Sequence, residues 1–272
     1  MLGSIIGDTV GSVYEFNNIK TTDFPFFSKR SNYTDDSIMT MAVASWLLED
    51  PSHSMETLED TMVKFGKAFP CPMGGYGGMF KRWLFGDDER KPYNSWGNGS
   101  AMRASAVGWM FDTLEETERV AKISAEITHN HPEGIKGAQA TAAAIFLARK
   151  GKSKTQIKDY ISKTYDYNLD RNCDEIRKVY DWDSSCQGTV PEAICAFLDS
   201  TDFESAIRLA VSLGGDSDTL ACITGGIAEA FYKDIPDDIA LTMWGKLPDS
   251  FKDILCNMAE ATSYKLPEVL RK

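Results

Sequence analysis

The stretch that decides the fold is Leu213-Gly214-Gly215-Asp216-Ser217-Asp218-Thr219, which separates two apolar helical patterns. Upstream, apolar residues recur at helical spacing over 204–213, and a glycine such as Gly214 typically lies just past the last helical turn. Downstream, over 218–232, apolar residues again recur at helical steps. Because two glycines allow a sharp turn, the pattern predicts two helices joined by a tight turn, with Asp216 at the start of the second.

The two aspartates of this stretch are separated by one residue, and that spacing restricts what they can do. Inside a helix, Asp216 and Asp218 would point about 200° apart, so their carboxylates can converge only at a helix N-terminus. One interpretation is that Asp216 simply caps the helix. The other is that both aspartates belong to a ligand site. A second cluster at another predicted helix start, Thr34-Asp35-Asp36, favours the ligand site.

The rest of the chain shows helical periodicity, and alternating strand patterns are essentially absent. Further helices are predicted over 2–16, 36–49, 54–68, 79–85, 101–111, 117–128, 134–149, 154–165, 174–181, 191–198, 237–247 and 251–264. A length of 272 residues allows one large domain or two small ones. Since the chain has no internal repeat and no low-complexity tail, we expect an all-α fold in a single domain, residues 1–272.

The first predicted helix carries three glycines at four-residue spacing, Gly3, Gly7 and Gly11. Each interior glycine costs a helix about 1 kcal/mol, so a stripe of three needs a compensating contact. Close packing of a neighbouring backbone is the simplest one, and we expect it here. Glu15 follows at the end of this helix, where the helix dipole disfavours an anion, which suggests either solvent exposure or a nearby cation.

Composition excludes several classes of function. The formal net charge of −11 argues against non-specific binding to nucleic acid or to anionic membrane surfaces. The sequence has no apolar run of membrane-spanning length, and its start lacks a basic segment followed by a signal-length apolar core. Six cysteines without a CxxC pair are typical of reduced thiols, so we expect a cytoplasmic protein. A monomer is the default expectation.

Residues 70–100 interrupt the helical pattern. Glycines, tyrosines and tryptophans are concentrated there around one short apolar piece. A disordered excursion is one interpretation, but Trp83, Phe85, Tyr93 and Trp96 would be poor choices for solvated chain. We therefore expect a binding loop.

The oxygen-bearing side chains at the two helix starts could hold metal ions. They are Thr34, Asp35, Asp36, Asp216, Asp218 and Thr219. Four carboxylates carry a charge of −4, which two divalent cations would balance, whereas four unpaired carboxylates would repel one another. Ligand sets made only of oxygen suit Mg²⁺ or Mn²⁺ rather than zinc, and three histidines are too few for a histidine-rich site. Two such ions could activate a water and hold vicinal substrate oxygens.

Five motifs occur in one order along the chain. They are Gly7-Asp8 with Gly11-Ser-Val-Tyr-Glu15, Tyr33-Thr-Asp-Asp36, Gly97-Asn-Gly-Ser-Ala-Met-Arg103, Thr128-His129 and Gly214-Gly-Asp-Ser-Asp-Thr219. In these motifs, and over nearly its whole length, the sequence resembles the ADP-ribosylglycohydrolase family. The resemblance implies a compact orthogonal bundle of helices. Ser217 departs from the family's usual threonine at a position that is not one of the implied ligands.

The resemblance also implies roles for individual residues. The six oxygen-bearing residues above would bind two divalent cations, and Glu15 would lie near them as general base or water-orienting group. The substrate would contact Asn98, Gly99, Ser100, Met102 and His129. Catalysis would depend on Glu15, Asp36 and Asp216. The implied reaction is hydrolysis at C1″ of the distal ribose of an ADP-ribosyl group, with an oxocarbenium-like centre developing as the acceptor leaves.

Several residues also predict how the nucleotide part of the substrate would be bound. Gly97–Ser100 precede a predicted helix, so backbone N–H groups and a positive dipole end could bind a pyrophosphate, although an ordinary tight turn is the alternative. One of Tyr76, Tyr93 or Trp96 could stack on adenine. His129 and His131 lack a third zinc ligand, which favours a substrate contact for His129 and a loop role for His131.

Two other functions stay open. One is a binuclear-metal hydrolase acting on a phosphoester or a free nucleotide sugar, because the carboxylates would serve either. The other is a non-catalytic ADP-ribose-binding protein. The partners expected for the ADP-ribosyl hydrolase that the resemblance implies are an ADP-ribosylated protein or other ADP-ribosylated acceptor and the product ADP-ribose. The sequence does not decide the acceptor linkage or the choice between Mg²⁺ and Mn²⁺.

Overall fold

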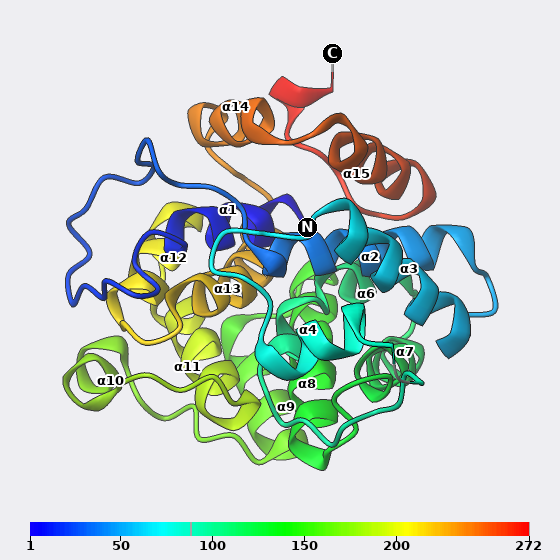
Figure 1. Ribbon diagram of the computed structural model, residues 1–272. Helices are drawn as coiled ribbons and strands as arrows, with labels where there is room; N and C mark the ends of the chain where they lie inside the picture. Colours follow the sequence, from blue (N-terminus) through cyan, green and yellow to red (C-terminus); the bar gives the residue numbers. More distant parts are fainter. Residues whose placement is uncertain (88, 272) are drawn as a thin grey trace.

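A computed structural model describes residues 1–87 and 89–271, and these residues form an all-α fold, as predicted (Figure 1). Its helices are α1 (Leu2–Gly11), α2 (Asp35–Glu49), α3 (Met55–Ala68), α4 (Gly78–Phe85), α5 (Gly99–Met102), α6 (Ser105–Met110), α7 (Leu114–Glu126), α8 (Pro132–Arg149), α9 (Lys154–Tyr165), α10 (Cys173–Val179), α11 (Cys186–Asp199), α12 (Phe203–Ser212), α13 (Ser217–Tyr232), α14 (Asp237–Lys246), α15 (Asp249–Ala261) and the 3-10 turn η1 (Glu268–Leu270). The described residues contain two isolated β-bridges, Thr34 with Met73 and Gly97 with Ser185, and no strand. Within them, every helix is too short or too polar to cross a lipid bilayer.

The contact between α1 and α13 lies at the centre of the fold (Figure 1). A Cβ on Gly3 would come within 2.4 Å of the Gly225 carbonyl oxygen, and one on Gly7 within 1.9 Å of the Ala221 oxygen. Gly11 would likewise meet Ser217 at 2.4 Å. The two backbones are therefore in direct contact, which confirms the interpretation of the glycine stripe. This contact places the C-terminal end of α1 beside the N-terminal end of α13.

A second central helix, α8, packs through small side chains. Its residues Ala138, Ala140 and Ala142 to Ala144 are fully buried, and α8 contacts α5, α6, α7 and α13. All six cysteines are free, and four of them are buried.

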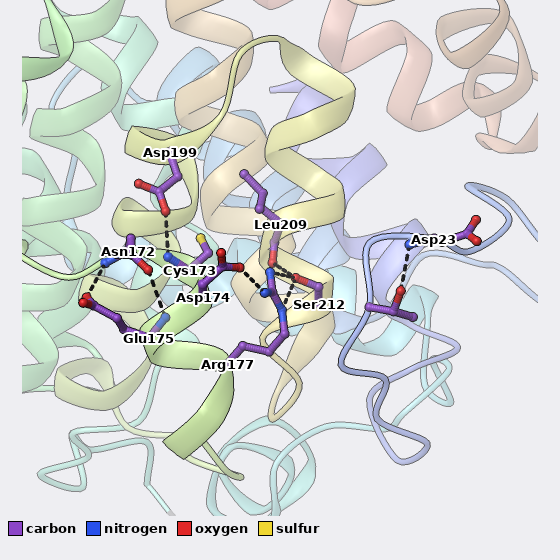
Figure 2. Close-up of polar contacts among 10 residues, drawn as sticks. Asp23, Asn172, Cys173, Asp174, Glu175, Arg177, Asp199, Leu209 and Ser212 are labelled. Carbon is purple, nitrogen blue, oxygen red and sulfur yellow. Dashed lines mark hydrogen bonds and ion pairs between the residues drawn. The ribbon is translucent and has the colours of Figure 1, made fainter.

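Helix α10 fixes the end of α12 (Figure 2). The Arg177 guanidinium donates to Ser212 Oγ from Nη2 at 2.8 Å and from Nε at 3.1 Å, and the Ser212 hydroxyl donates to the Leu209 carbonyl. The start of α10 is in turn held by α11, because the Cys173 N–H donates to Asp199 at 2.6 Å. These contacts anchor the chain directly before Gly214.

Three helices differ from the predicted ranges in ways that matter for the site. The first helix ends at Gly11 rather than at residue 16, because the Asn18 amide donates to the Tyr14 and Glu15 carbonyls and stabilises a turn. The predicted helix 101–111 is broken after Met102, where Arg103 (φ −90°, ψ 0°) turns its side chain into the interior.

The predicted helix 191–198 was too short. It begins at Cys186, where Ser185 caps it by accepting the Gly188 N–H, and Pro191 lies within its second turn. The remaining helix boundaries differ from prediction by three residues or fewer.

Candidate functional site

The turn before α13 is built by glycine and by a side chain from the first loop. Gly214 and Gly215 have φ values of +75° and +69°, which favour glycine. Asn18 binds this turn on both sides, accepting the Gly215 N–H at 2.7 Å and donating to the Gly215 carbonyl at 2.9 Å. The Lys20 ammonium also donates to the Leu213 carbonyl. Neither Asn18 nor Lys20 was identified from sequence.

Asp216 occupies the N-cap position of α13, but its side chain makes no capping hydrogen bond. Instead, its Oδ2 accepts from the Asn98 amide at 2.7 Å. Asp216 is buried, and Asn98 also donates to Thr189 at 3.0 Å. The capping interpretation is therefore wrong for Asp216, and its carboxylate faces the segment around Gly97.

The second cluster is held by a buried acid that sequence reasoning did not identify as a site residue. Thr34 caps α2 by accepting the Asp36 N–H, and its hydroxyl donates to Asp8 at 2.7 Å. Asp8 also accepts the Thr34 N–H at 2.9 Å, the Ser37 N–H at 3.1 Å and the Ser37 hydroxyl. Burial raises the pKa of Asp8 to about 6 against the lowering effect of these donors. A single aspartate in an apolar helix carries no spacing signal, which is why Asp8 was missed.

Both clusters open into one cavity of about 390 Å³. Two loops close around it, because the β-bridges attach Met73 to Thr34 and Ser185 to Gly97. The predicted site residues that line it are Glu15, Asp35, Asp36, Asn98, Gly99, Met102, His129, Asp216, Asp218 and Thr219. Thr34 and Ser100 do not line it. A larger cavity of about 520 Å³ beside the C-terminal segment contains none of them.

Three of the acids converge, because Glu15, Asp216 and Asp218 offer carboxylate oxygens within 4.8 Å of one another. Glu15 lies in the turn beyond α1 and is half-buried against Gly74. Asp36 joins this group through Thr219, whose hydroxyl donates to Asp36 Oδ2 at 3.4 Å. Asp36 Oδ1 is buried and has no hydrogen-bond partner among the described residues.

Burial and mutual repulsion raise the pKa values of these carboxyls. The pKa of Glu15 is raised to about 7, first by burial and then by the charges of Asp216 and Asp8. Burial, followed by neighbouring aspartates, also raises the pKa values of Asp36 and Asp218 well above the usual range. Asp35 behaves in the same way. Within the described residues, none of these acids forms an ion pair with lysine or arginine.

This donor set fits divalent cations. Buried carboxylates without protein counter-ions are destabilising unless a cation neutralises them. The unpartnered Asp36 Oδ1 is a free ligand atom on a residue that lines the same cavity. Because every donor is oxygen, the site suits hard ions.

The segment that begins at Gly97 forms another part of the cavity wall. The N–H of Asn98 donates to the Ser184 carbonyl, and that of Gly97 to Ser95 Oγ, whereas the Gly99 N–H has no acceptor among the described residues. Helix α5 has only four residues, so the expected dipole is too small to matter. The Ser100 hydroxyl donates to the Gly134 carbonyl at 2.7 Å, away from the cavity.

The aromatic candidates fall into two groups. Tyr76 and Tyr93 line the cavity, whereas Trp96 is half-exposed outside it and packs on His131. His131 caps α8 by accepting the Glu133 N–H, in agreement with the loop role predicted for it. Two exposed aromatic residues of the cavity rim, Phe16 and Trp182, stack at 5.6 Å and were not identified from sequence.

Known proteins are similar to this chain over most of its length. Residues 1–266 match the family model described as ADP-ribosylglycohydrolase. The chain is 26% identical to ADP-ribosylhydrolase ARH3 of Gallus gallus, over 85% of this chain and 84% of that protein. It is 23% identical to ADP-ribosylarginine hydrolase Tri1 of Pseudomonas putida, over 85% of this chain and 69% of that protein. A solved structure, an ADP-ribosylglycohydrolase-related protein complex, shares the fold with a TM-score of 0.72, at 20% identity and 96% coverage of both chains. The chain belongs to the ADP-ribosylglycohydrolase family.

Proposed function

We propose that the protein is a metal-dependent hydrolase that releases ADP-ribose from a modified acceptor by cleaving the glycosidic bond at C1″ of the distal ribose. The observation that carries this proposal is the convergence of Glu15, Asp216 and Asp218 within 4.8 Å in a cavity that the Gly97 segment also lines. The names of the relatives, which include hydrolases of ADP-ribosyl groups, support the same reaction.

Two divalent cations, Mg²⁺ or Mn²⁺, would be held by Thr34, Asp35, Asp36, Asp216, Asp218 and Thr219. When bound, such ions supply Lewis acidity toward water and a fixed position for vicinal hydroxyls. The protein prepares these ligands with its own hydrogen bonds. Asn98 occupies Oδ2 of Asp216 and thereby fixes that carboxylate, while Asp8 fixes the backbone of Thr34 at the start of α2.

Glu15 would accept the proton of the attacking water. It lies in a turn rather than on a helix, and a Cβ on Gly74 would approach its Oε2 to 2.9 Å, so the carboxylate is held close to the loop that closes the cavity. Its carboxylate oxygen lies within 4.8 Å of those of Asp216 and Asp218, close enough to take a proton from a water held beside them.

The nucleotide would lie along the part of the cavity wall that the Gly97 segment forms. The free N–H of Gly99 and the ring of His129 offer donors to phosphate or ribose oxygens there. Tyr76 and Tyr93, which line the cavity, are the candidates for stacking on adenine, and Trp96 is not. The acceptor would leave past Phe16 and Trp182 at the rim.

A substrate panel tests this function. ADP-ribose linked to arginine, to serine and to nucleic-acid ends would be compared with free ADP-ribose and simple phosphoesters, with Mg²⁺, Mn²⁺ or EDTA, for the wild type and for Glu15→Gln. We expect metal-dependent release of ADP-ribose from at least one glycosidic substrate and strong loss in Glu15→Gln. Cleavage confined to phosphoesters, or binding of ADP-ribose without turnover of any substrate, would contradict the proposal.

A further inference from the structure

Arg103 is a buried cation without an acidic partner. Its side chain is 1% exposed, and among the described residues it forms no ion pair. Nη2 donates instead to the Ser124 carbonyl at 2.7 Å and to the Thr128 hydroxyl at 2.8 Å. The guanidinium carbon lies 5.9 Å from the Phe80 ring centre. Because an uncompensated buried charge is costly, a specific use for this guanidinium is expected.

The hydrogen bonds around Thr128 have a fixed direction. A guanidinium can only donate, so the Thr128 oxygen accepts from Arg103 and its single proton must point elsewhere. His129 Nδ1 lies 2.7 Å from that oxygen. If Nδ1 carried a proton, Thr128 would receive two donors, and its own proton would have to go to another acceptor, for which the Tyr93 hydroxyl is the candidate. The arrangement that uses the 2.7 Å contact for the Thr128 proton makes Nδ1 the acceptor.

The other ring nitrogen of His129 faces the cavity wall. A Cβ on Gly99 would lie 3.1 Å from Nε2, and one on Gly97 would lie 3.5 Å from it. No hydrogen-bond partner for Nε2 is found within the part of the chain that is described, and His129 lines the cavity. Burial and the Arg103 charge both lower the pKa of His129 well below its usual value, so the ring is neutral.

We propose that Arg103, acting through Thr128, holds His129 in the tautomer protonated at Nε2, so that the ring offers a neutral N–H donor to an oxygen of the nucleotide beside Gly97 and Gly99. Arg103 and Thr128 are positioning residues. The identity of the ligand rests on the proposed function, whereas the tautomer does not. With the other tautomer, an Nε2 lone pair would face phosphate oxygens, which can only accept, and acceptors repel one another.

The tautomer can be observed directly, because the chain has only three histidines. Two-bond ¹H–¹⁵N correlation spectra of the ligand-free protein in Mg²⁺ distinguish the two neutral tautomers and the cation, and His53→Gln and His131→Gln assign the remaining signals to His129. We expect His129 to be neutral, with the proton on Nε2 and an Nδ1 signal typical of a hydrogen-bonded acceptor. A proton on Nδ1, or a charged ring at neutral pH, would overturn the proposal.

Variants test the link from Arg103 through Thr128 to His129, which we call the relay. Thr128→Val removes the hydroxyl, and Thr128→Ser is its matched control because it keeps the hydroxyl. We expect Thr128→Val to change the Nδ1 signal and to weaken binding of ADP-ribose in Mg²⁺, measured by calorimetry, by about tenfold. Thr128→Ser should restore both. Arg103→Met should shift the His129 signals toward a mixture of protonation states, and it tests the same link if it folds.

The outcomes separate the two proposals. His129 signals that stay unchanged in both Thr128→Val and Arg103→Met would overturn the relay. A wild-type protein that has the expected tautomer but does not bind ADP-ribose would contradict the proposed function and leave the relay standing. Where turnover can be measured, a relay that acts on substrate binding should raise KM more than it lowers kcat.

Discussion

Asp218→Asn should raise the stability of the metal-free protein and reduce the extra stability that metal binding gives. Asp218 is buried, and its carboxylate has no lysine or arginine partner within the described residues. Its oxygens lie within 4.8 Å of those of Glu15 and Asp216. The amide has nearly the same shape but no charge, so the substitution removes repulsion while it removes a metal ligand.

The size of the effect follows from Coulomb's law. Two unit charges no more than 4.8 Å apart repel by at least about 3.5 kcal/mol at an effective dielectric constant near 20. Protonation of neighbouring acids relieves part of this repulsion, so we expect a gain in unfolding free energy of roughly 1–3 kcal/mol in EDTA, or a Tm rise of several degrees. A metal at a hundredfold excess over its Kd stabilises the wild type by about 2.7 kcal/mol. We expect most of this increment to be lost in the variant.

The assay is thermal unfolding at pH 7.5 in EDTA and in excess Mn²⁺ or Mg²⁺. Glu192→Gln is the matched control, because Glu192 is also a buried acid but is bound by Arg171 at 2.9 Å and 2.6 Å. That control should lower Tm in EDTA and keep the full metal increment. If Asp218→Asn instead lowers Tm in EDTA and keeps the increment, Asp218 has a structural role and the electrostatic reasoning is wrong.

Three further results are expected. Gly7→Ala should destabilise the protein by about 3 kcal/mol in urea unfolding, because its Cβ would lie 1.9 Å from the Ala221 oxygen. The control Gly245→Ala, whose Cβ meets nothing within 4 Å, should be neutral or stabilising. Equal effects would contradict the α1–α13 contact. Asp8→Asn should weaken metal affinity in calorimetric titrations by tenfold or more, because an amide cannot accept all four hydrogen bonds from the start of α2. Unchanged affinity would show that Asp8 has no role in preparing the metal site. The unfolding free energy in EDTA should fall as pH rises from about 4 to 7. The pKa values of Asp8 (about 6) and Glu15 (about 7) are raised, so the folded state binds more protons than the unfolded state in that window. A Tm that rises over this range would refute the assignment.

The sequence predicted those features that depend on spacing along the chain. The glycine stripe predicted a close backbone contact, and Gly214 with Gly215 predicted the turn that the positive φ values confirm. The helix break at Arg103 was not predicted, because apolar residues continue at helical spacing through it and only its buried partners, Ser124 and Thr128, explain the turn.

Contacts between distant residues could not be predicted in the same way. Asn98 and Asp216 are separated by 118 positions, and their hydrogen bond decides that Asp216 faces the cavity instead of capping α13. Asp8 lies in the first motif, but its role could not be predicted either, since its four donors come from the start of another helix. Ser100 shows the converse, because a residue within a recognisable motif is turned toward the Gly134 carbonyl.

The central claim is that the acids at the start of α13 belong to a hydrolytic metal site. The most direct test is release of ADP-ribose from an ADP-ribosylated protein by the wild type and by the Asp216→Ala, Asp218→Ala double variant, each in Mn²⁺ and in EDTA. We predict release by the wild type in Mn²⁺ alone and none by the folded double variant in either condition. Undiminished metal-dependent release by the double variant would contradict the claim.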